Sequence, residues 1–308
     1  MKTLARLNLN LRNLALLLAA FPCYADGYLK MSLPGNSPEL FAPGIVSTQE
    51  AEHGSIAVAP DGKSIYWSRR LEELDRQWVI MTSKLIENRW TPPEIASFSF
   101  KGYSSSDPSF SSDGNYLFFH SDYPVETDKN RLPNIWYVKK DASGWLSPKP
   151  VSDAVNNYFA ANPAMSLNQQ LYFTSIRDDT KGKFDIYYSD VVDGQFLSPV
   201  NLGSSINSKF VEARATISPD DSYLIFWSIG RSDSLGSGDL YISFRDNHGG
   251  WKKAVNMGPA VNSKFNDSFP SISADGKYLF FMSNRNGNDD IYWLALSELI
   301  DTYFTDEP

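Results

Sequence analysis

Residues 273–285 read Ser273-Ala274-Asp275-Gly276-Lys277-Tyr278-Leu279-Phe280-Phe281-Met282-Ser283-Asn284-Arg285, and Asp290-Ile291-Tyr292-Trp293 follows shortly after. The stretch combines an Asp-Gly turn signal with two short runs of aromatic and aliphatic residues. Such a turn predicts a β-hairpin, because glycine accepts positive φ and aspartate hydrogen-bonds its own backbone. A third strand is then expected at Asp290 to Trp293.

This pattern occurs five times along the chain. Its turn residue recurs at Asp61, Asp113, Asn168, Asp220 and Asp275, at intervals of 52, 55, 52 and 55 residues. A period of this length is typical of propellers and solenoids. We therefore predict an all-β protein, a β-propeller with five blades, and keep six blades as the alternative.

Each repeat predicts a four-stranded blade. The first strand ends just before the turn, and the second and third strands hold most of the aromatic residues, which make up 14% of the chain. Aromatic side chains suit sheets that stack face to face around a ring. The expected first strands are 56–58, 108–110, 163–165, 215–217 and 270–272. After residue 25, no helical periodicity is visible.

The last repeat lacks a fourth strand, and an additional strand of this type precedes the first repeat. Residues 38–47 resemble the Pro-containing end of the other repeats, whereas Trp293 runs directly into an acidic segment. We predict that Leu40 to Ser47 pairs beside Ile291 to Leu296, which closes the ring and removes open sheet edges. The predicted divisions are a signal peptide at 1–25, a linker at 26–37, one propeller domain at 38–297 and an acidic tail at 298–308.

The N-terminus predicts export. Lys2, Arg6 and Arg12 precede an apolar run at 14–21, and small residues stand at the two positions that a signal peptidase reads before Asp26. The apolar run is far below the ~20 residues that span a bilayer. We expect cleavage after Ala25 and a mature protein in a periplasm or outside the cell, soluble and monomeric.

Charge and cysteine content narrow the function further. The formal charge of −8 becomes −11 when the three basic residues of 1–25 are removed, since that segment holds no acid. This balance disfavours nucleic acids and anionic membranes as partners. The single cysteine, Cys23, leaves with the signal, so no disulfide or thiol chemistry is expected. With three histidines and no remaining cysteine, we predict no metal site and no cofactor.

The repeat resembles that of the TolB-type β-propellers, which are exported bacterial proteins. The resemblance rests on Ser-x-Asp-Gly, then Leu-Phe-Phe-x-Ser-x-Arg, then Asp-Ile-Tyr, and it covers about residues 38–296. It implies the propeller fold strongly and function only weakly, because such propellers include binding proteins, sugar-active enzymes and domains of peptidases. The chain shows five repeats where TolB has six blades, and it has no room for TolB's N-terminal domain.

Residues that differ between blades at one axial level are the candidate ligand-binding residues. Alignment on the Asp-Gly turn puts the start of the first strand around one mouth of the channel, with these residues: Glu52, His53, Asp107, Asn162, Glu212, Arg214 and Asp267. A mixed set of carboxylates, an amide, an imidazole and a guanidinium predicts a polar pocket, unless these groups only solvate a wet channel. The second-blade loop, Asp122 to Pro133, is a further candidate because it breaks the repeat pattern.

Residues that recur in most blades are expected to be structural. Arg69, Arg177, Arg231 and Arg285 follow the second strand, and Asp185, Asp239 and Asp290 precede the third. We predict that these arginines and aspartates pair within each blade.

Two functions fit the sequence. The first is a binding propeller that takes a protein, a peptide or a glycan at its axial mouth. The second is a glycan-active enzyme, a glycosidase or lyase, in which Glu52, Asp107, Glu212 and Asp267 supply acid and base groups. We favour binding, because none of the common catalytic motifs is present.

Overall fold

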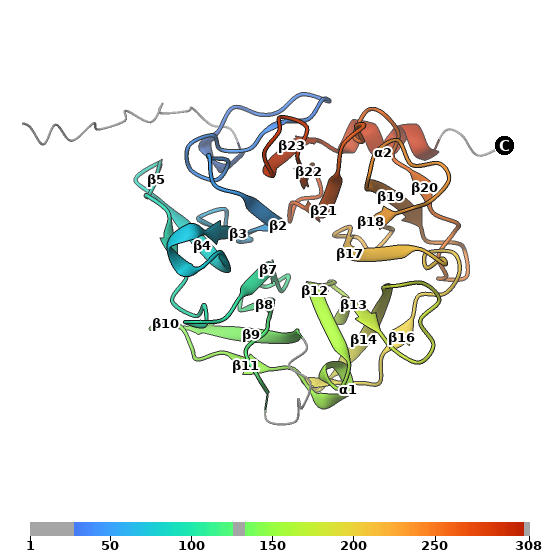
Figure 1. Ribbon diagram of the computed structural model, residues 1–308, viewed down its shortest axis with the longest axis horizontal. Helices are drawn as coiled ribbons and strands as arrows, with labels where there is room; N and C mark the ends of the chain where they lie inside the picture. The colour runs from blue at the N-terminus through green and yellow to red at the C-terminus, as the bar shows by residue number, and fades with distance from the viewer. Residues whose placement is uncertain (1–27, 126–132, 305–308) are drawn as a thin grey trace, which may run out of the picture.

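The computed structural model describes residues 28–125 and 133–304 and has five sheets of four or five strands arranged around a central axis (Figure 1). The predicted all-β propeller of five blades is therefore confirmed. The predicted signal peptide at 1–25 lies outside the described residues. No helix among the described residues is long and apolar enough to cross a membrane.

The strands of each blade run outward from the axis in chain order. Blade one holds β2 (Glu52–Val58), β3 (Ser64–Leu71), β4 (Gln77–Ile86), β5 (Arg89–Trp90) and β6 (Glu94–Ile95). Blade two holds β7 (Ser105–Phe110), β8 (Tyr116–Ser121), β9 (Asn134–Asp141), β10 (Gly144–Trp145) and β11 (Lys149–Pro150). Blade three holds β12 (Phe159–Met165), β13 (Gln170–Ile176), β14 (Asp185–Val192), β15 (Gln195–Phe196) and β16 (Val200–Asn201). Blade four holds β17 (Val211–Ile217), β18 (Tyr223–Ile229), β19 (Asp239–Phe244) and β20 (Val255–Asn256), and blade five holds β21 (Asp267–Ile272), β22 (Tyr278–Ser283) and β23 (Asp290–Ala295).

The fourth strand of blade five comes from the N-terminus, as predicted. Strand β1 (Glu39–Leu40) pairs antiparallel with β23, with Glu39 opposite Trp293 and Leu40 opposite Tyr292. The ladder is shorter than the predicted Leu40 to Ser47, because the chain turns at Ala42 (φ 45°) and Pro43 has no N–H to donate. The Phe41 N–H and the Ser47 hydroxyl still donate to the Ile291 carbonyl, at 2.8 and 3.1 Å.

The core lies between neighbouring blades. At the junction of blades five and one, the buried residues Phe41, Trp67, Phe280 and Trp293 belong to one cluster, and the rings of Phe280 and Trp293 stack 5.8 Å apart. The aromatic residues of the second and third strands therefore hold the ring together blade by blade. This is the packing that the repeat pattern predicts.

Two segments differ from their predicted character. The predicted linker contains the 3-10 turn η1 (Tyr28–Lys30), whose Leu29 is buried and whose Tyr28 ring stacks on Tyr278 at 4.7 Å. The predicted acidic tail begins with helix α2 (Ser297–Phe304), which buries Ile300 against blade five. A second helix, α1 (Asp153–Asn156), lies between blades two and three, and a 3-10 turn, η2 (Glu72–Leu74), joins β3 to β4. These helices were missed because each spans only one or two turns, too short for a periodic pattern.

Candidate functional site

Each innermost strand carries a bulge at the same place, and one residue there has positive φ. The five residues, which we call the axial ring, are Gly54 (φ 74°), Asp107 (55°), Asn162 (53°), Arg214 (49°) and Phe269 (52°). The register of every first hairpin shifts across this position. A bulge redirects a side chain, and positive φ is uncommon outside glycine. The repeated bulge therefore brings one residue of each blade to the same level of the axis.

The polar members of the axial ring meet across blades. The Asn162 amide donates to the Asp107 carboxylate at 2.6 Å, and the Ser55 N–H donates to its other oxygen at 3.3 Å. The His120 ring lies 3.3 Å from the same carboxylate. Burial acts to raise the pKa of Asp107, but His120, His53, Arg214 and the Asn162 hydrogen bond outweigh it, so the pKa is lowered. Asp107 is therefore a buried, ionised carboxylate.

Arg214 bridges three blades at the axis. It extends from blade four, donates to the Pro163 carbonyl of blade three at 2.6 Å, and hydrogen-bonds the Ser55 hydroxyl of blade one. It is only 2% exposed, and its Nε has no hydrogen-bond partner. Burial lowers the pKa of Arg214 to about 10, against the opposing effect of Asp107. Its guanidinium remains charged at neutral pH.

An aromatic stack occupies another sector of the axis. The His53 ring lies between Trp78 and Phe269, with ring centres 4.4 Å from each, and Phe269 stacks on Trp227 at 5.1 Å. His53, Trp78 and Trp227 are half-buried. Burial lowers the pKa of His53, so the imidazole is neutral at neutral pH. The axis thus presents an aromatic sector opposite a charged and amide sector.

Three of the predicted site residues lie in a second, different ring. Glu52 pairs with Arg69 at 2.9 Å, Glu212 with Arg231 at 3.0 Å and Asp267 with Arg285 at 2.6 Å, and none of these carboxylates is exposed. We call them the acid–arginine pairs. Each carboxylate also accepts from the hydroxyl of the residue four positions earlier, which is Thr48, Ser208 or Ser263.

The predicted partners of these arginines are wrong. Two of the three aspartates before the third strand instead cap their own loop: Lys181 N–H donates to Asp185 at 2.8 Å, and Leu235 N–H donates to Asp239 at 2.6 Å. Arg177 binds the Ala154 and Val155 carbonyls rather than an acid. An aspartate at the start of the third strand lies beside its own turn, and the backbone N–H groups of that turn bind its carboxylate in place of the arginine.

Glu52 differs electrostatically from the other pairs. Burial raises its pKa to about 7, although Arg69 and Thr48 act to lower it. Burial also raises the pKa of Asp290, which adjoins Glu52. A carboxyl group at the junction of blades one and five therefore changes its protonation near neutral pH.

The face around the start of the innermost strands exposes aromatic side chains. Tyr103, Tyr158 and Phe265 are 36%, 36% and 38% exposed, and Phe210 is half-buried. One comes from the loop before the first strand in each of blades two to five, ten residues before the turn residue. Arg177, Lys209 and Lys264 lie over three of these rings, at 4.9 to 5.2 Å. We call these four residues the aromatic rim.

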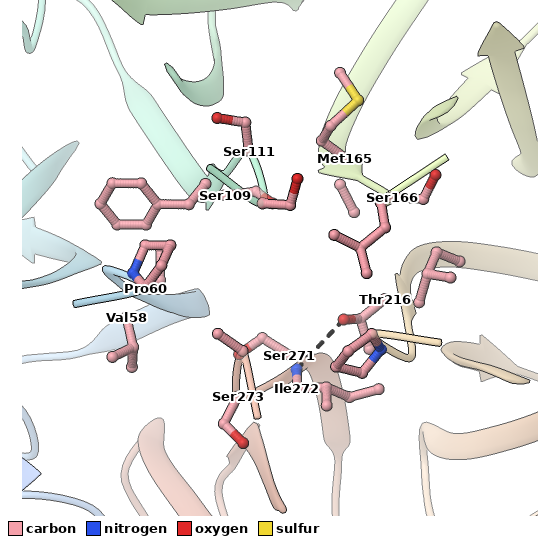
Figure 2. Close-up of a pocket in the computed structure, with 18 of the residues that line it drawn as sticks. Val58, Pro60, Ser109, Ser111, Met165, Ser166, Thr216, Ser271, Ile272 and Ser273 are labelled. Carbon is pink, nitrogen blue, oxygen red and sulfur yellow. Dashed lines mark hydrogen bonds between the residues drawn. The ribbon is translucent and has the colours of Figure 1, made fainter. Parts of the chain in front are cut away.

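At the opposite end of the axis the same strands enclose a cavity of about 160 Å³ (Figure 2). Its walls come from all five blades and include Ser109, Thr216 and Ser271, with Arg214 reaching it from the axial ring. Arg214 is the one charged residue among those that line it. Sequence reasoning placed the site at the other end and did not identify this cavity.

The structure thus divides the seven predicted site residues. It brings His53, Asp107, Asn162 and Arg214 together at the axis, and it places Glu52, Glu212 and Asp267 in the acid–arginine pairs. Sequence reasoning missed Phe269, Trp78, Trp227 and His120. Alignment on the turn would have found Phe269, which stands six residues before Asp275, as Arg214 does before Asp220.

Two further predictions bear on the site. Of the second-blade loop, residues 126–132 lie outside the described residues, whereas Tyr123 stacks on Phe100 at 4.0 Å. In the described part of the chain, no three His, Cys, Asp or Glu residues are grouped to hold a metal ion.

Comparison with solved structures supports the fold. The chain is similar to an α-L-arabinofuranosidase from Lactobacillus brevis (12% identity, TM-score 0.50, covering 81% of this chain and 90% of that one). It is also similar to a thermostable family-43 glycoside hydrolase (11%, 0.51, 82% and 90%) and to a TolB-like protein from Agrobacterium tumefaciens (15%, 0.49, 81% and 76%). At 12% and 11% identity, the likeness to the first two structures shows the fold alone. No protein-family model and no curated protein sequence matches the chain.

Proposed function

We propose that this protein is an exported TolB-type β-propeller that binds a protein, peptide or glycan at the axial mouth where its innermost strands begin. The aromatic rim and the half-buried stack of His53, Trp78 and Trp227 supply the contact surface. Aromatic residues are the side chains that most often dominate binding interfaces. The acidic balance of the chain makes a nucleic acid an unsuitable partner.

One observation favours binding over glycan chemistry: the carboxylates at this mouth are already engaged. A glycosidase needs two carboxyl groups ~5–9.5 Å apart that can reach the sugar. Glu52, Glu212 and Asp267 are fully buried in ion pairs, and Asp107 is fully buried and bound by Asn162. Asp107, Glu212 and Asp267 are therefore not exposed at the mouth, and Glu52, whose pKa is raised to about 7, changes its protonation inside the junction of blades one and five.

The test measures binding and catalysis side by side. Peptide and glycan libraries are screened with the wild type, with Tyr158→Ala/Phe265→Ala and with Trp78→Ala. The control, Val200→Ala/Val255→Ala, removes two exposed residues of the outer strands. We expect the rim variant and Trp78→Ala to lose at least ~10-fold in affinity, as for interface hot spots, and the control to bind as the wild type does.

A contrary result would be hydrolysis. If the protein cleaves aryl glycosides such as a nitrophenyl arabinofuranoside, and Asp107→Asn abolishes the cleavage, the glycan-active enzyme is the correct function. Ligand binding that the rim variant and the control retain equally would also overturn the proposal.

The export part of the proposal rests on the basic and apolar pattern of residues 2–21 and the small residues before Asp26. N-terminal sequencing of protein recovered from a periplasmic fraction tests it. The expected first residue is Asp26. Recovery in the cytoplasm with Met1 retained would overturn it.

A further inference from the structure

We propose that the cavity at the Asp-Gly end of the axis is a second ligand site, which takes an organic carboxylate with its charged end toward Arg214 and its apolar part toward solvent. This site lies at the other end of the axis from the proposed binding mouth and is independent of it.

The first argument is the state of Arg214. A buried guanidinium is normally paired with a carboxylate, because removing its charge from water is costly. Its hydrogen-bond partners are neutral oxygens, the Pro163 carbonyl and the Ser55 hydroxyl. Asp107 acts on its pKa from beyond ion-pair distance, and in the chain as described no carboxylate forms an ion pair with Arg214. Its Nε–H is unused. A planar guanidinium with spare N–H groups is suited to bind a carboxylate.

The second argument is the layering of the cavity walls. Next to Arg214 stands a belt of small residues, Ala57, Ser109, Ala164, Thr216 and Ser271, one from each blade. The next residue of each strand is larger and apolar and also lines the cavity, and each of these residues packs in part against the hydrophobic cluster beside its blade: Val58, Phe110, Met165, Ile217 and Ile272. Figure 2 shows Ser109, Thr216 and Ser271 together with Val58, Met165 and Ile272 around the cavity. A wall with one guanidinium, small residues beside it and apolar residues next to these matches a ligand that is charged at one end and apolar at the other.

The third argument concerns which hydroxyls are free. The serines at the turns are occupied: Ser111 donates to Asp113 and Ser273 to Asp275, each at 2.6 Å. In the belt, Ser271 donates to the Ile56 carbonyl and Thr216 accepts from the Ile272 N–H. The belt therefore offers few unused polar groups for a neutral sugar, which would need many. The remaining strong interaction in the cavity is with Arg214.

The size of the cavity fits a small ligand. A single water needs about 10–15 Å³ of such space, so about 160 Å³ admits a short carbon chain with its carboxylate. Two sources offer this chemistry, a free carboxylic acid and the C-terminal residue of a peptide. Exposed turn aspartates surround the opening, so added salt, which screens exposed charges more than buried ones, should strengthen binding.

The experiment titrates purified protein calorimetrically with hexanoate and, as the matched neutral probe, hexanamide. A dipeptide ending in leucine is then compared with its C-terminal amide to distinguish the two sources. We expect the carboxylates to bind and the amides not to bind. Arg214→Met should weaken carboxylate binding about 10- to 100-fold, the range for a hydrogen-bonded charge, while Arg89→Met, the same change at an exposed arginine, should have no effect.

A second variant keeps the test decisive if Arg214→Met fails to fold. Ser109→Leu fills the cavity from its half-buried wall and leaves the guanidinium in place, so it should abolish carboxylate binding while the fold persists. Absence of hexanoate and dipeptide binding, equal binding of acid and amide, or unchanged binding in Ser109→Leu would each overturn the proposal. Loss of binding at the aromatic rim would leave it unaffected.

Discussion

The acid–arginine pairs and the axial ring lie two residues apart on the same strands, yet they hold charge in opposite ways. Glu212 and Asp267 are each matched by an arginine of their own blade. Two residues further on, Arg214 has only neutral hydrogen-bond partners, and Asp107 reaches three other blades. The acid–arginine pairs repeat the same ion pair within single blades, whereas the axial ring combines a different side chain from each blade. Repetition therefore marks the structural residues, and variation marks those available to a ligand.

Breaking an acid–arginine pair should have the largest effect. Glu212→Ala leaves Arg231, whose side chain is only 13% exposed, without its carboxylate, and losing one partner of a buried pair costs about 3–5 kcal/mol in the free energy of unfolding. Thermal unfolding should show a clear drop in Tm. The control is Glu72→Ala in the exposed pair with Arg76, where about 0–1 kcal/mol is expected. A Glu212→Ala protein as stable as the wild type would place Glu212 with the functional residues.

The pair at the ring closure should respond to pH. Because the folded pKa of Glu52 is raised from 4.5 to about 7, folding takes up a proton, and the contribution of this group to stability is complete below pH 4.5 and is lost as pH rises toward 7. The contribution of this group falls by about 3 kcal/mol across that window. Urea unfolding at pH 5 and pH 8 measures it. In Glu52→Gln this component of the pH dependence should vanish, and an unchanged profile would contradict the assignment.

The axial ring can be disturbed at its smallest member. A Cβ added to Gly54 would overlap the Asp107 carboxylate, and its φ of 74° is strained for alanine. We expect Gly54→Ala to destabilise the fold by about 2 kcal/mol or more. Gly102→Ala is the matched control, since its φ of 83° is similar but the space around it is open, so it should cost only about 1 kcal/mol. Equal losses in the two variants would show that the contact with Asp107 is unimportant.

The smallest effect on stability is expected at the mouth. Trp227 is half-buried, and its indole N–H has no partner, so Trp227→Phe keeps the stacking on Phe269 and loses no hydrogen bond. The free energy of unfolding should change by about 1 kcal/mol or less. Ligand affinity at the mouth should fall more than stability does. A variant that unfolds readily would place Trp227 in the core instead.

The fold could be predicted from the sequence because its period is explicit. The Asp-Gly turns located the hairpins, and the unmatched strand at each end predicted the closure by β1. Short helices such as α2 gave no periodic signal.

The acid–arginine pairs and the axial ring could not be told apart from the sequence, because the bulge in each innermost strand determines which way a side chain points. Counting from the turn puts Glu212 and Arg214 on one face of a strand, whereas the positive φ at Arg214 redirects its side chain to the axis. Alignment on the turn places Arg214 and Phe269 at one level, but arginine and phenylalanine do not signal positive φ, so the sequence does not show the bulge there. Gly54 is the exception, and it shifts the count in blade one, where Glu52 stands nine residues before Asp61 rather than eight.

The closure by β1 also sets the order of folding. Glu39 pairs with Trp293, so the first strand to leave the ribosome is the last to find its partner. Contacts this distant in sequence form slowly, because the entropy of the whole intervening chain must be lost before the contacts stabilise the fold. Until Asp290–Ala295 has been synthesised, the N-terminal segment has no sheet to join, and blade five has an uncovered edge. The pairing of β1 with β23 therefore completes the ring last. Before this pairing forms, the uncovered edge of blade five can pair with the wrong strand.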